Sequence, residues 1–458
     1  MRYFKALICI PSIMNPNYFW LLLLTILIKL NGAYGQVDAP NIIFILTDDQ
    51  GYADAGCYGS PDILTPNIDR IAHSGVRFTQ FYANAPICSP SRAAILTGKT
   101  PHRAGVPRNA GGNNGMPTSE VTIAEVLKEH GYATANIGKW HLGNTPESQP
   151  LGQGFDHQFG HFVGCIDNYS HFYFWNGPNR HDLYRNGKEI FADGAYFPEL
   201  CYNEASAFID KNQDQPFYMY YAMNTPHYPY QGSAKWLSYY NEQQVPYPRN
   251  LYAAFVSTFD EYIGKLIDKI ESMGLREKTI IVFQSDHGHS TEERAHFGGG
   301  SAGIYRGAKG SLFEGGLRVP AMISWPGHLE EGVSRDQWVL ASDWFPTLLD
   351  LAGLPLASHR IDGTSISQIL KEQGSAEIHD QWHWRLGEQW SVRQGSWKLL
   401  FDPKDTSETH RPPPNKAADT YFLVNLKEDP AERTNLASQY PERVKQLKAL
   451  YAELSSLD

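Results

Sequence analysis

The chain has 458 residues, 42% of them hydrophobic, and a formal net charge of −10 at pH 7. This length fits one large domain, or a large domain with a smaller companion, and the composition is that of a globular protein. An acidic surface argues against a nucleic acid partner, because binding to phosphates requires clustered lysines and arginines.

Residues 1–35 differ from the rest of the chain. Arg2 and Lys5 precede an apolar run over 18–30, and a site of small residues follows it. This pattern predicts a secretory signal peptide over 1–35, and therefore a periplasmic or secreted protein. An uncleaved membrane anchor is the alternative, but the run is shorter than the ~20 residues that a span needs and contains Lys29. We expect no stable membrane span.

Four cysteines follow the predicted signal peptide: Cys57, Cys88, Cys165 and Cys201. Their spacing matches neither a zinc site nor a disulfide framework. Export to an oxidising compartment would allow a Cys165–Cys201 disulfide, and two buried thiols are the alternative.

Apolar, strand-like runs alternate with helical patterns along most of the chain. β-branched and aromatic residues predict strands over 41–47, 132–138, 216–223, 279–285 and 319–327. Capped, periodic segments predict helices over 65–75, 119–131 and 251–274. This alternation predicts an α/β catalytic domain over 36–375, with a large, mostly parallel sheet sandwiched by helices.

The pattern changes near residue 380. Segments 390–401 and 420–426 resemble antiparallel strands, and a final helix is predicted over 441–454. We therefore expect a smaller C-terminal α+β subdomain over 376–458 with a short antiparallel sheet. Residues 140–215 have little periodicity, and a long loop of this kind in a compact protein is usually functional.

Polar residues gather where the predicted parallel strands end. In open α/β sheets, ligands bind at the carboxyl ends of the strands, so these residues should share one edge. Adjacent acids after a buried strand repel each other unless a cation binds, and three carboxylates with one imidazole favour a hard ion. We expect Ca²⁺ in preference to Mg²⁺, with Zn²⁺ as the alternative because of the imidazole; separate solvated loops are the other interpretation. The residues are Asp48, Asp49, Lys139, His141, His227, Asp286 and His287.

The stretch CSPSRAAILTG, residues 88–98, places a cysteine at the start of a predicted helix. Ser89 is a suitable N-cap and Pro90 fits the first helical position, so Cys88 should lie just before the helix. Free N–H groups and the helix dipole favour negative charge there, and Arg92, about one turn along, can bind the same anion. Cys88 is then either a buried structural thiol or a reactive or modified residue.

Several motifs together resemble one known family. CSPSR matches the C-x-P-S-R signature of the type I sulfatases, and GYATANIGKWHLG resembles their second signature. The order TDDQGY, CSPSR, GKWHLG, TPH, SDHG and K…EGGLRVP, in which the lysine is Lys309, is also the order of that family. Two signatures in register are specific, and the resemblance covers about residues 40–440. The family lies in the alkaline-phosphatase superfamily, and the chain is most similar to its bacterial polysaccharide sulfatases.

The resemblance implies that a maturation enzyme oxidises Cys88 to Cα-formylglycine (3-oxoalanine), which hydrates to a diol. One hydroxyl of the diol would attack sulfur and expel the alcohol; the second would then lose its proton, and sulfate would leave. One Ca²⁺, held by Asp48, Asp49, Asp286, His287 and residue 88, would stabilise the developing charge. Many relatives carry Asn at position 287.

The resemblance also assigns roles to the remaining polar residues. Lys139, Lys309 and Arg92 would bind the sulfate and the diol. His227 would protonate the leaving alcohol and His141 would act as the base, and these two roles are exchangeable.

The implied activity is hydrolysis of sulfate esters on a sulfated carbohydrate, with an algal polysaccharide such as ulvan or carrageenan as the expected substrate. An arylsulfatase or a glycosaminoglycan sulfatase is the alternative, and the intact C-x-P-S-R motif argues against a phosphomonoester or phosphonate hydrolase. A protein that only binds sulfated glycans would lack a catalytic residue, and none is missing. Sugar contacts are predicted from aromatic and polar residues, with ordinary loop packing as the alternative for each: Asn168, Tyr169, His171, Trp175, Arg180 and Trp384.

Overall fold

The computed structural model describes residues 39–111, 115–175, 177–356, 360–407 and 420–458. Residues Pro40–Asp458 form one compact unit. The predicted signal peptide over 1–35 lies outside the described residues. No helix in the described ranges combines the length and the apolar character needed to cross a bilayer.

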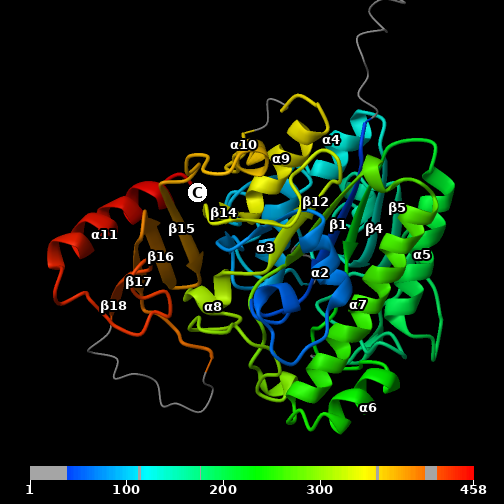
Figure 1. Ribbon diagram of the computed structural model, residues 1–458, viewed down its shortest axis with the longest axis horizontal. Coiled ribbons are helices and arrows are strands. Elements are labelled where there is room, and N and C mark those ends of the chain that lie inside the picture. Colours follow the sequence, from blue (N-terminus) through cyan, green and yellow to red (C-terminus); the bar gives the residue numbers. More distant parts are fainter. Residues whose placement is uncertain (1–38, 112–114, 176, 357–359, 408–419) are drawn as a thin grey trace, which may run out of the picture. The chain divides into compact units, whose positions relative to one another are not determined.

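A ten-stranded sheet forms the centre of the fold (Figure 1). Its strands follow the order β13-β2-β12-β11-β1-β10-β4-β5-β8-β9. The strands from β11 to β5 are parallel, and antiparallel pairs flank them on both sides, so the predicted mostly parallel core of the sheet is confirmed. The bounds are β1 (Asn41–Thr47), β2 (Val76–Phe78), β4 (Ala133–Lys139), β5 (His157–His161), β8 (Tyr184–Arg185), β9 (Lys188–Glu189), β10 (Phe217–Ala222), β11 (Thr279–Ser285), β12 (Ala321–Ser324) and β13 (Val333–Arg335).

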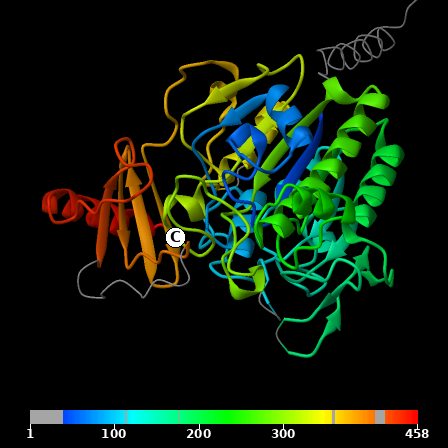
Figure 2. The same ribbon diagram turned by 60° about the horizontal axis from the view of Figure 1, so that its bottom comes forward.

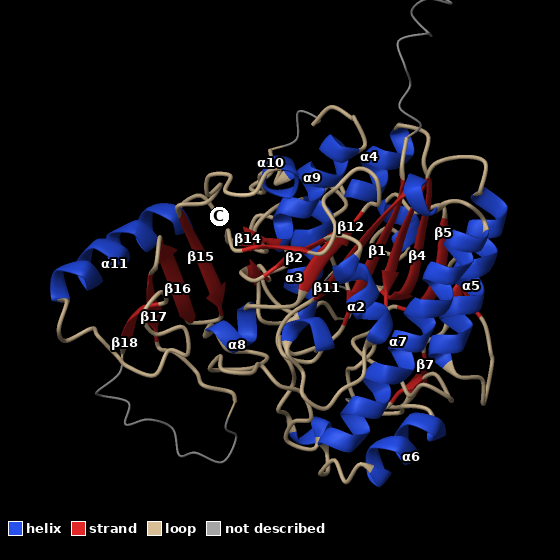
Figure 3. Cartoon of the chain, viewed as in Figure 1, coloured by secondary structure: helices blue, strands red, loops and turns tan. Residues whose placement is uncertain are grey.

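Helices cover both faces of this sheet (Figure 3). Ile43 and Ile45 of β1 pack in a core with residues of α2, α5 and α7, whereas Phe44 contacts Trp344 of α9, with ring centroids 6.3 Å apart. Apolar residues on both faces of a strand are typical of a sheet that is covered on both sides. The helix bounds are α2 (Pro66–His73), α3 (Cys88–Thr97), α4 (Ile123–Glu129), α5 (Phe197–Asn212), α6 (Ala234–Glu242), α7 (Arg249–Ser272), α8 (Glu314–Leu317), α9 (Trp344–Leu351) and α10 (Ser367–Lys371).

The predicted strands differ from the observed ones mainly at β12, which lies between β2 and β11. The strands predicted over 41–47 and 279–285 have the bounds of β1 and β11. The strand predicted over 319–327 is confined to Ala321–Ser324 and runs antiparallel to β11. The two strands are antiparallel because the chain enters β12 at the end of the sheet where β11 finishes.

The prediction of one long loop over 140–215 was wrong. Short strands occur there, including β6 (Phe172–Tyr173), which pairs with β7 (Arg180–His181), and α5 spans sixteen residues. Many Asn, His and Gly residues in the preceding stretch obscured the helical spacing of the apolar residues in α5. Those apolar residues are buried against the sheet: Phe197, Cys201, Ala205, Phe208 and Ile209.

The C-terminal residues form a second sheet in the antiparallel order β15-β16-β17-β18. Helix α11 lies along one face of it (Figure 2), and Leu447 of this helix packs against Val392 and Leu399. Trp384 and Phe422 pack on the other face with residues of the large domain. The predicted small α+β unit is therefore confirmed, and its boundary at 375/376 stays a prediction. The bounds are β15 (Gln381–Leu386), β16 (Gln389–Gln394), β17 (Trp397–Phe401), β18 (Tyr421–Asn425) and α11 (Pro441–Ser455), and a further pair joins β3 (Phe81–Tyr82) to β14 (Val339–Leu340).

Cys165 and Cys201 are both buried free thiols, so they form no disulfide. Cys201 lies in the core on α5, and Cys165 packs with Tyr228 and Ala295. Burial raises the pKa of Cys165 to about 11 and that of Cys201 well above its usual value. Both thiols are therefore poor nucleophiles.

The parallel strands end in register at one edge of the large sheet. Thr47 of β1 pairs with Ser285 of β11, Leu46 pairs with Ala222 of β10, and Ala222 pairs with Gly138 of β4. The polar residues that follow these strands therefore leave the sheet at the same level. This edge is where ligands bind in open α/β sheets.

Candidate active site

Helix α3 begins at Cys88 itself. The residue before it, Ile87, is extended, with φ −144° and ψ 156°. The prediction that Ser89 is the N-cap was therefore wrong. Ser89 lies in the first turn, where its Oγ accepts a hydrogen bond from the backbone N–H of Ala110 at 2.9 Å instead of capping the helix. This bond fixes a neighbouring loop to the turn that carries Cys88.

Four buried side chains bring their ligand atoms within 4.8 Å of one another: Asp48, Asp49, Cys88 and His287. The Nδ1 atom of His287 donates to the carbonyl of Gly288 at 3.0 Å, so in the neutral ring that a metal ion would bind the lone pair lies on Nε2. This Nε2 atom lies 3.4 Å from Asp49 Oδ1, which is buried without a hydrogen-bond partner among the described residues. Carboxylate oxygens and an imidazole lone pair in one buried space fit a divalent cation.

Asp286 lies beside this cluster. Its Oδ1 accepts a hydrogen bond from the backbone N–H of Asp49 at 3.1 Å and lies 3.6 Å from His287 Nε2. Its Oδ2 accepts from Arg92 Nη2 at 3.1 Å. Burial raises the pKa of Asp49 to about 7 and that of Asp286 to about 6. Buried carboxylates with raised pKa values gain most from a nearby cation.

Two lysines form ion pairs with the carboxylates of Asp48 and Asp49. Lys139 Nζ lies 2.7 Å from Asp48 Oδ2, and Lys309 Nζ lies 2.9 Å from Asp49 Oδ2. Burial disfavours a thiolate, but the two lysines lower the pKa of Cys88 to about 6. The position of residue 88 therefore favours a negatively charged atom. Lys309 lines the pocket described below, whereas Lys139 is fully buried and does not.

Arg92 lies inside the protein and not in the pocket. Its side chain is fully buried, its Nη1 donates to the backbone carbonyl of Lys139 at 3.1 Å, and its Nη2 lies 3.5 Å from Asp48 Oδ1. Together with the bond to Asp286, these contacts occupy the guanidinium group. The predicted contact of Arg92 with sulfate is therefore corrected to contacts with the acidic cluster.

Two histidines line the pocket beside Cys88. His227 Nδ1 donates to the carbonyl of Tyr228 at 2.8 Å, which leaves Nε2 3.7 Å from Asp49 Oδ2. His141 has a left-handed backbone with φ 57°, and its buried Nδ1 has no partner among the described residues. Such backbone is uncommon outside glycine and often marks a functional position. Burial and the nearby lysines lower the pKa of both imidazoles well below the usual value, so both are neutral at pH 7.

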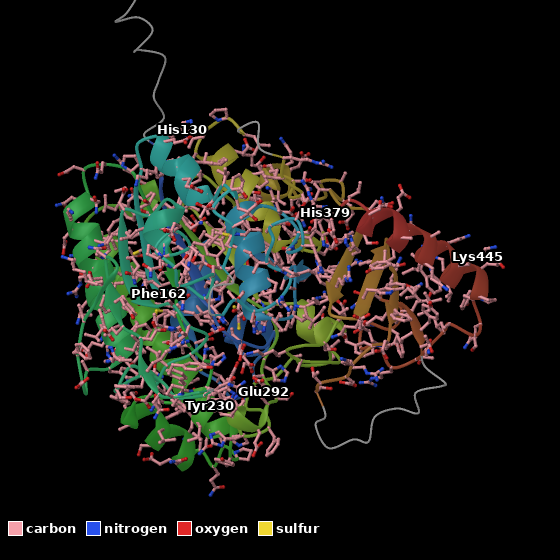
Figure 4. The ribbon with its side chains drawn as sticks, turned by 180° about the vertical axis from the view of Figure 1, so that it is seen from behind. His130, Phe162, Tyr230, Glu292, His379 and Lys445 are labelled. Atoms are coloured by element: carbon pink, nitrogen blue, oxygen red, sulfur yellow. The ribbon has the colours of Figure 1, made fainter. Side chains whose placement is uncertain are left out.

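The pocket has a cavity volume of about 310 Å³. Cys88, His141, His227 and Lys309 line it together with aromatic, charged and glycine residues; two of these residues, Phe162 and Glu292, are labelled in Figure 4. The sequence interpretation missed several of them, although a charged pair soon after the SDHG motif was a usable signal. The missed residues are Asn109, Phe162, Tyr173, Tyr228, Glu292 and Arg294.

Three of the six predicted sugar contacts are solvent-accessible. Trp175 and Arg180 line the pocket. Tyr169 is 40% exposed and stacks on Tyr196, with ring centroids 5.1 Å apart, but it does not line the pocket. The structure thus brings two of the six residues to the pocket.

The other three predicted sugar contacts are corrected. Asn168, His171 and Trp384 are buried, with at most 1% of each residue exposed. Each also hydrogen-bonds to a neighbouring segment of the protein, although the Nδ1 atom of His171 has no partner among the described residues. Asn168 and His171 stabilise loops, and Trp384 packs between the C-terminal sheet and the large domain.

Comparison with known proteins identifies the family. The family model described as Sulfatase matches residues 40–354, and the model described as N-sulphoglucosamine sulphohydrolase, C-terminal, matches residues 303–457. The chain belongs to the sulfatase family. This sulfatase hydrolyses sulfate esters, and both parts of its fold are those of the family.

Curated relatives and solved structures agree with this family. The sulfatase is 33% identical to arylsulfatase A from Homo sapiens in an alignment 478 positions long, gaps included, which covers 95% of this chain and 91% of the relative. It is 36% identical to N-acetylgalactosamine-6-sulfatase from Homo sapiens in an alignment 369 positions long, which covers 74% of this chain and 67% of that relative. The crystal structure of Ps i-CgsB is similar with a TM-score of 0.79 at 30% identity, covering 91% of this chain and 92% of that one. The complex of Ps i-CgsB with k-i-k-neocarrahexaose gives a TM-score of 0.78, with the same identity and coverage.

Proposed function

We propose that this sulfatase removes sulfate from a sulfated carbohydrate, and more narrowly from an algal polysaccharide such as ulvan or carrageenan. The observation that carries the proposal is the position of Cys88, in a pocket where buried carboxylates, lysines and two histidines meet. The likeness to Ps i-CgsB, which was solved with k-i-k-neocarrahexaose, supports a carbohydrate substrate. The predicted signal peptide over 1–35 supports a periplasmic or secreted enzyme, where polysaccharide fragments are accessible.

Asp48, Asp49 and His287 hold one Ca²⁺ in this proposal, with Asp286 beside them and residue 88 as a further ligand. The unpartnered Oδ1 of Asp49 and the free lone pair of His287 Nε2 fit such an ion. Carboxylate oxygens favour Ca²⁺, and the imidazole makes Zn²⁺ the competing ion. When bound, the ion would stabilise the negative charge that builds up on the sulfate oxygens.

Residue 88 supplies the nucleophile after a maturation enzyme converts Cys88 to Cα-formylglycine. One hydroxyl of the hydrated aldehyde loses its proton to solvent, and the resulting oxyanion bonds to sulfur while the bond from sulfur to the sugar oxygen breaks. The second hydroxyl then loses its proton, the aldehyde re-forms, and sulfate leaves. Lys139 and Lys309, which lower the pKa of Cys88, would stabilise an oxyanion at the same position.

His227 is the proposed general acid and His141 the proposed base. Because His227 Nδ1 donates to the carbonyl of Tyr228, its Nε2 is the atom that would deliver a proton to the leaving sugar oxygen, once the negative charge of a bound sulfate ester has raised the pKa of the imidazole and Nε2 has been protonated. His141 lines the same pocket and would accept the proton from the second hydroxyl of residue 88. The roles of acid and base could be exchanged between His227 and His141. The two alternatives predict a different dependence of activity on the leaving group.

Lys309 is the lysine that contacts the sulfate, because it lines the pocket. Arg92 acts as a positioning residue in this proposal, whereas Lys139 stabilises the oxyanion on residue 88 and also holds Asp48. Their contacts with Asp48 and Asp286 hold the acidic cluster in place.

The test is sulfate release from a panel of substrates, with Cys88→Ala as the inactive control. We expect oligosaccharides of ulvan or carrageenan to react faster than p-nitrophenyl sulfate. A panel in which only aryl sulfates or glycosaminoglycan fragments react would refute the algal substrate and support the activities named for the human relatives. Phosphate release with two zinc ions per chain would instead support a phosphatase.

A further inference from the structure

We propose that Arg180 and Arg294 form a second anion-binding subsite, so that the enzyme prefers a substrate with another sulfate or carboxylate near the scissile sulfate. This inference rests on the proposed function and adds the charge pattern of the substrate to it. Both arginines line the same pocket as Cys88 and Lys309. No step of the proposed reaction uses either of them.

The guanidinium group of Arg294 lies against two aromatic rings whose centroids are 6.3 Å apart, so the rings cover adjacent sides of it. Its Cζ lies 3.5 Å from the ring centroid of Trp175 and 4.8 Å from that of Tyr228. The N–H donors of a guanidinium lie in its plane, so contact with aromatic rings fixes its orientation without using up those donors. A planar fork of donors in a fixed orientation binds the paired oxygens of a carboxylate or sulfate well.

Glu292 occupies only a small part of this edge. Its Oε1 lies 3.3 Å from Arg294 Nη2, while its Oε2 accepts a hydrogen bond from the hydroxyl of Tyr228 at 3.1 Å and lies 3.8 Å from Lys309 Nζ. Most of the five N–H donors of a guanidinium therefore stay available on Arg294. Lys309 is already paired with Asp49, and among the described residues that line the pocket Glu292 is the one acidic side chain, so a single carboxylate is left to balance Arg180 and Arg294.

Arg180 adds a second cation to the pocket. It lies on β7 opposite Tyr173 of β6, and its Cζ is 4.9 Å from the ring centroid of Tyr173. Arg180 is exposed and has no carboxylate within 4.0 Å in the part of the chain that the structure describes. Once the scissile sulfate has neutralised Lys309, the positive charge of Arg180 and Arg294 attracts a further anion.

The experiment compares matched sugars and matched variants of the mature enzyme. The substrates are three disaccharides with the same scissile sulfate: one with no other charge, one with a second sulfate and one with a carboxylate. Arg180→Gln and Arg294→Gln each remove one positive charge. Arg443→Gln is the control, because Arg443 also faces an aromatic ring, with its Cζ 6.0 Å from the centroid of Trp397, but does not line the pocket.

We expect Arg180→Gln and Arg294→Gln to lower kcat/KM about 10- to 100-fold on a doubly charged sugar and about twofold or less on the singly charged one. The preference of the wild type for two charges should weaken as salt is added. The doubly charged sugar that shows the larger loss identifies the second anion as sulfate or carboxylate. Equal losses on all three sugars, or no loss, would overturn the subsite.

Calorimetric binding of the same sugars to Cys88→Ala protein separates this inference from the proposed function. If the wild type releases no sulfate from any sugar but Cys88→Ala protein still prefers two charges in an Arg294-dependent way, the proposed function fails and the subsite stands. If the Cys88→Ala protein binds none of the sugars, both fail.

Discussion

The Nε2 atom of His287 lies 3.3 Å from the Sγ atom of Cys88. Because the other imidazole nitrogen donates to a backbone carbonyl, the lone pair of Nε2 and the sulfur atom share one buried space with Asp48 and Asp49. An oxygen atom built on residue 88 in that space would contact a bound cation as well as the substrate. In the proposed mechanism the nucleophile and the metal ligands work as one unit, so loss of either should stop turnover without unfolding the protein.

Removal of the metal should abolish sulfate release reversibly. Elemental analysis should find about one Ca²⁺ per chain, and Asp49→Ala should lose both the ion and most of the activity. His287→Asn keeps an oxygen ligand and should retain more activity than His287→Ala, whose metal affinity should fall about 10- to 100-fold. Full activity after exhaustive chelation would contradict the proposed role of the ion.

The two histidines should respond differently to the leaving group. A sugar alcohol is a poor leaving group that needs a proton, so His227→Ala should lower the rate on a sugar sulfate about 10²- to 10⁴-fold. Nitrophenolate leaves easily, so the same variant should lose much less with p-nitrophenyl sulfate. His141→Ala should slow both substrates similarly, because breakdown of the intermediate on residue 88 no longer involves the alcohol.

The ratio of the two rates within each histidine variant is the control, since it cancels any loss of folded enzyme. Equal losses for His227→Ala on both substrates would remove it from the role of acid. A loss in His141→Ala that depends on the leaving group would mean that the two roles are reversed.

A buried ion cluster should set the stability of the contact between the two sheets. Lys398 of β17 lies 2.9 Å from Glu314 of α8 and 3.0 Å from Glu432, and all three side chains are buried. Lys398→Met leaves two buried carboxylates without their lysine, so it should lower the free energy of unfolding by about 3–5 kcal/mol at pH 8. Urea denaturation measures this loss, and adding Glu432→Gln to the variant should restore part of it.

The loss in Lys398→Met should also depend on pH. Burial raises the pKa of Glu432 from 4.5 to about 7, so the folded protein binds a proton more tightly than the unfolded chain. The contribution of Glu432 to the free energy of unfolding therefore falls as the pH rises through this range. Without the lysine this fall should be steeper, and a destabilisation that does not change between pH 5 and pH 8 would contradict the proposed charge state.

The sequence predicts that the acidic residues of the cluster and His287 gather at one place, because local signals fix their positions, and their role as metal ligands stays a prediction. Asp48 and Asp49 end a buried strand, Asp286 and His287 end its neighbour, and parallel strands bring their carboxyl ends to one edge. The position of Cys88 at the start of a helix is predicted by the specific motif that contains it. These predictions need only strand order and residue type.

The surroundings of the pocket depend on contacts that no local pattern encodes. Arg92 meets Asp286, which lies 194 residues away in the chain, so its burial could not be read from its own helix. Trp384 is of a residue type that often contacts sugars, but its side chain fills the space between the two sheets. Arg294 was missed because a charged loop residue has no periodic signal, and its position depends on Trp175 from a different loop.

The most direct test of the central claim is the mass of the peptide that contains residue 88, measured on the same preparation whose sulfate release is assayed. We predict an aldehyde in place of the Cys88 thiol, with sulfate release rising in proportion to the converted fraction. Cys88→Ala protein, with an unchanged Tm, should release no sulfate. An active preparation in which residue 88 is entirely unmodified cysteine would contradict the proposed mechanism.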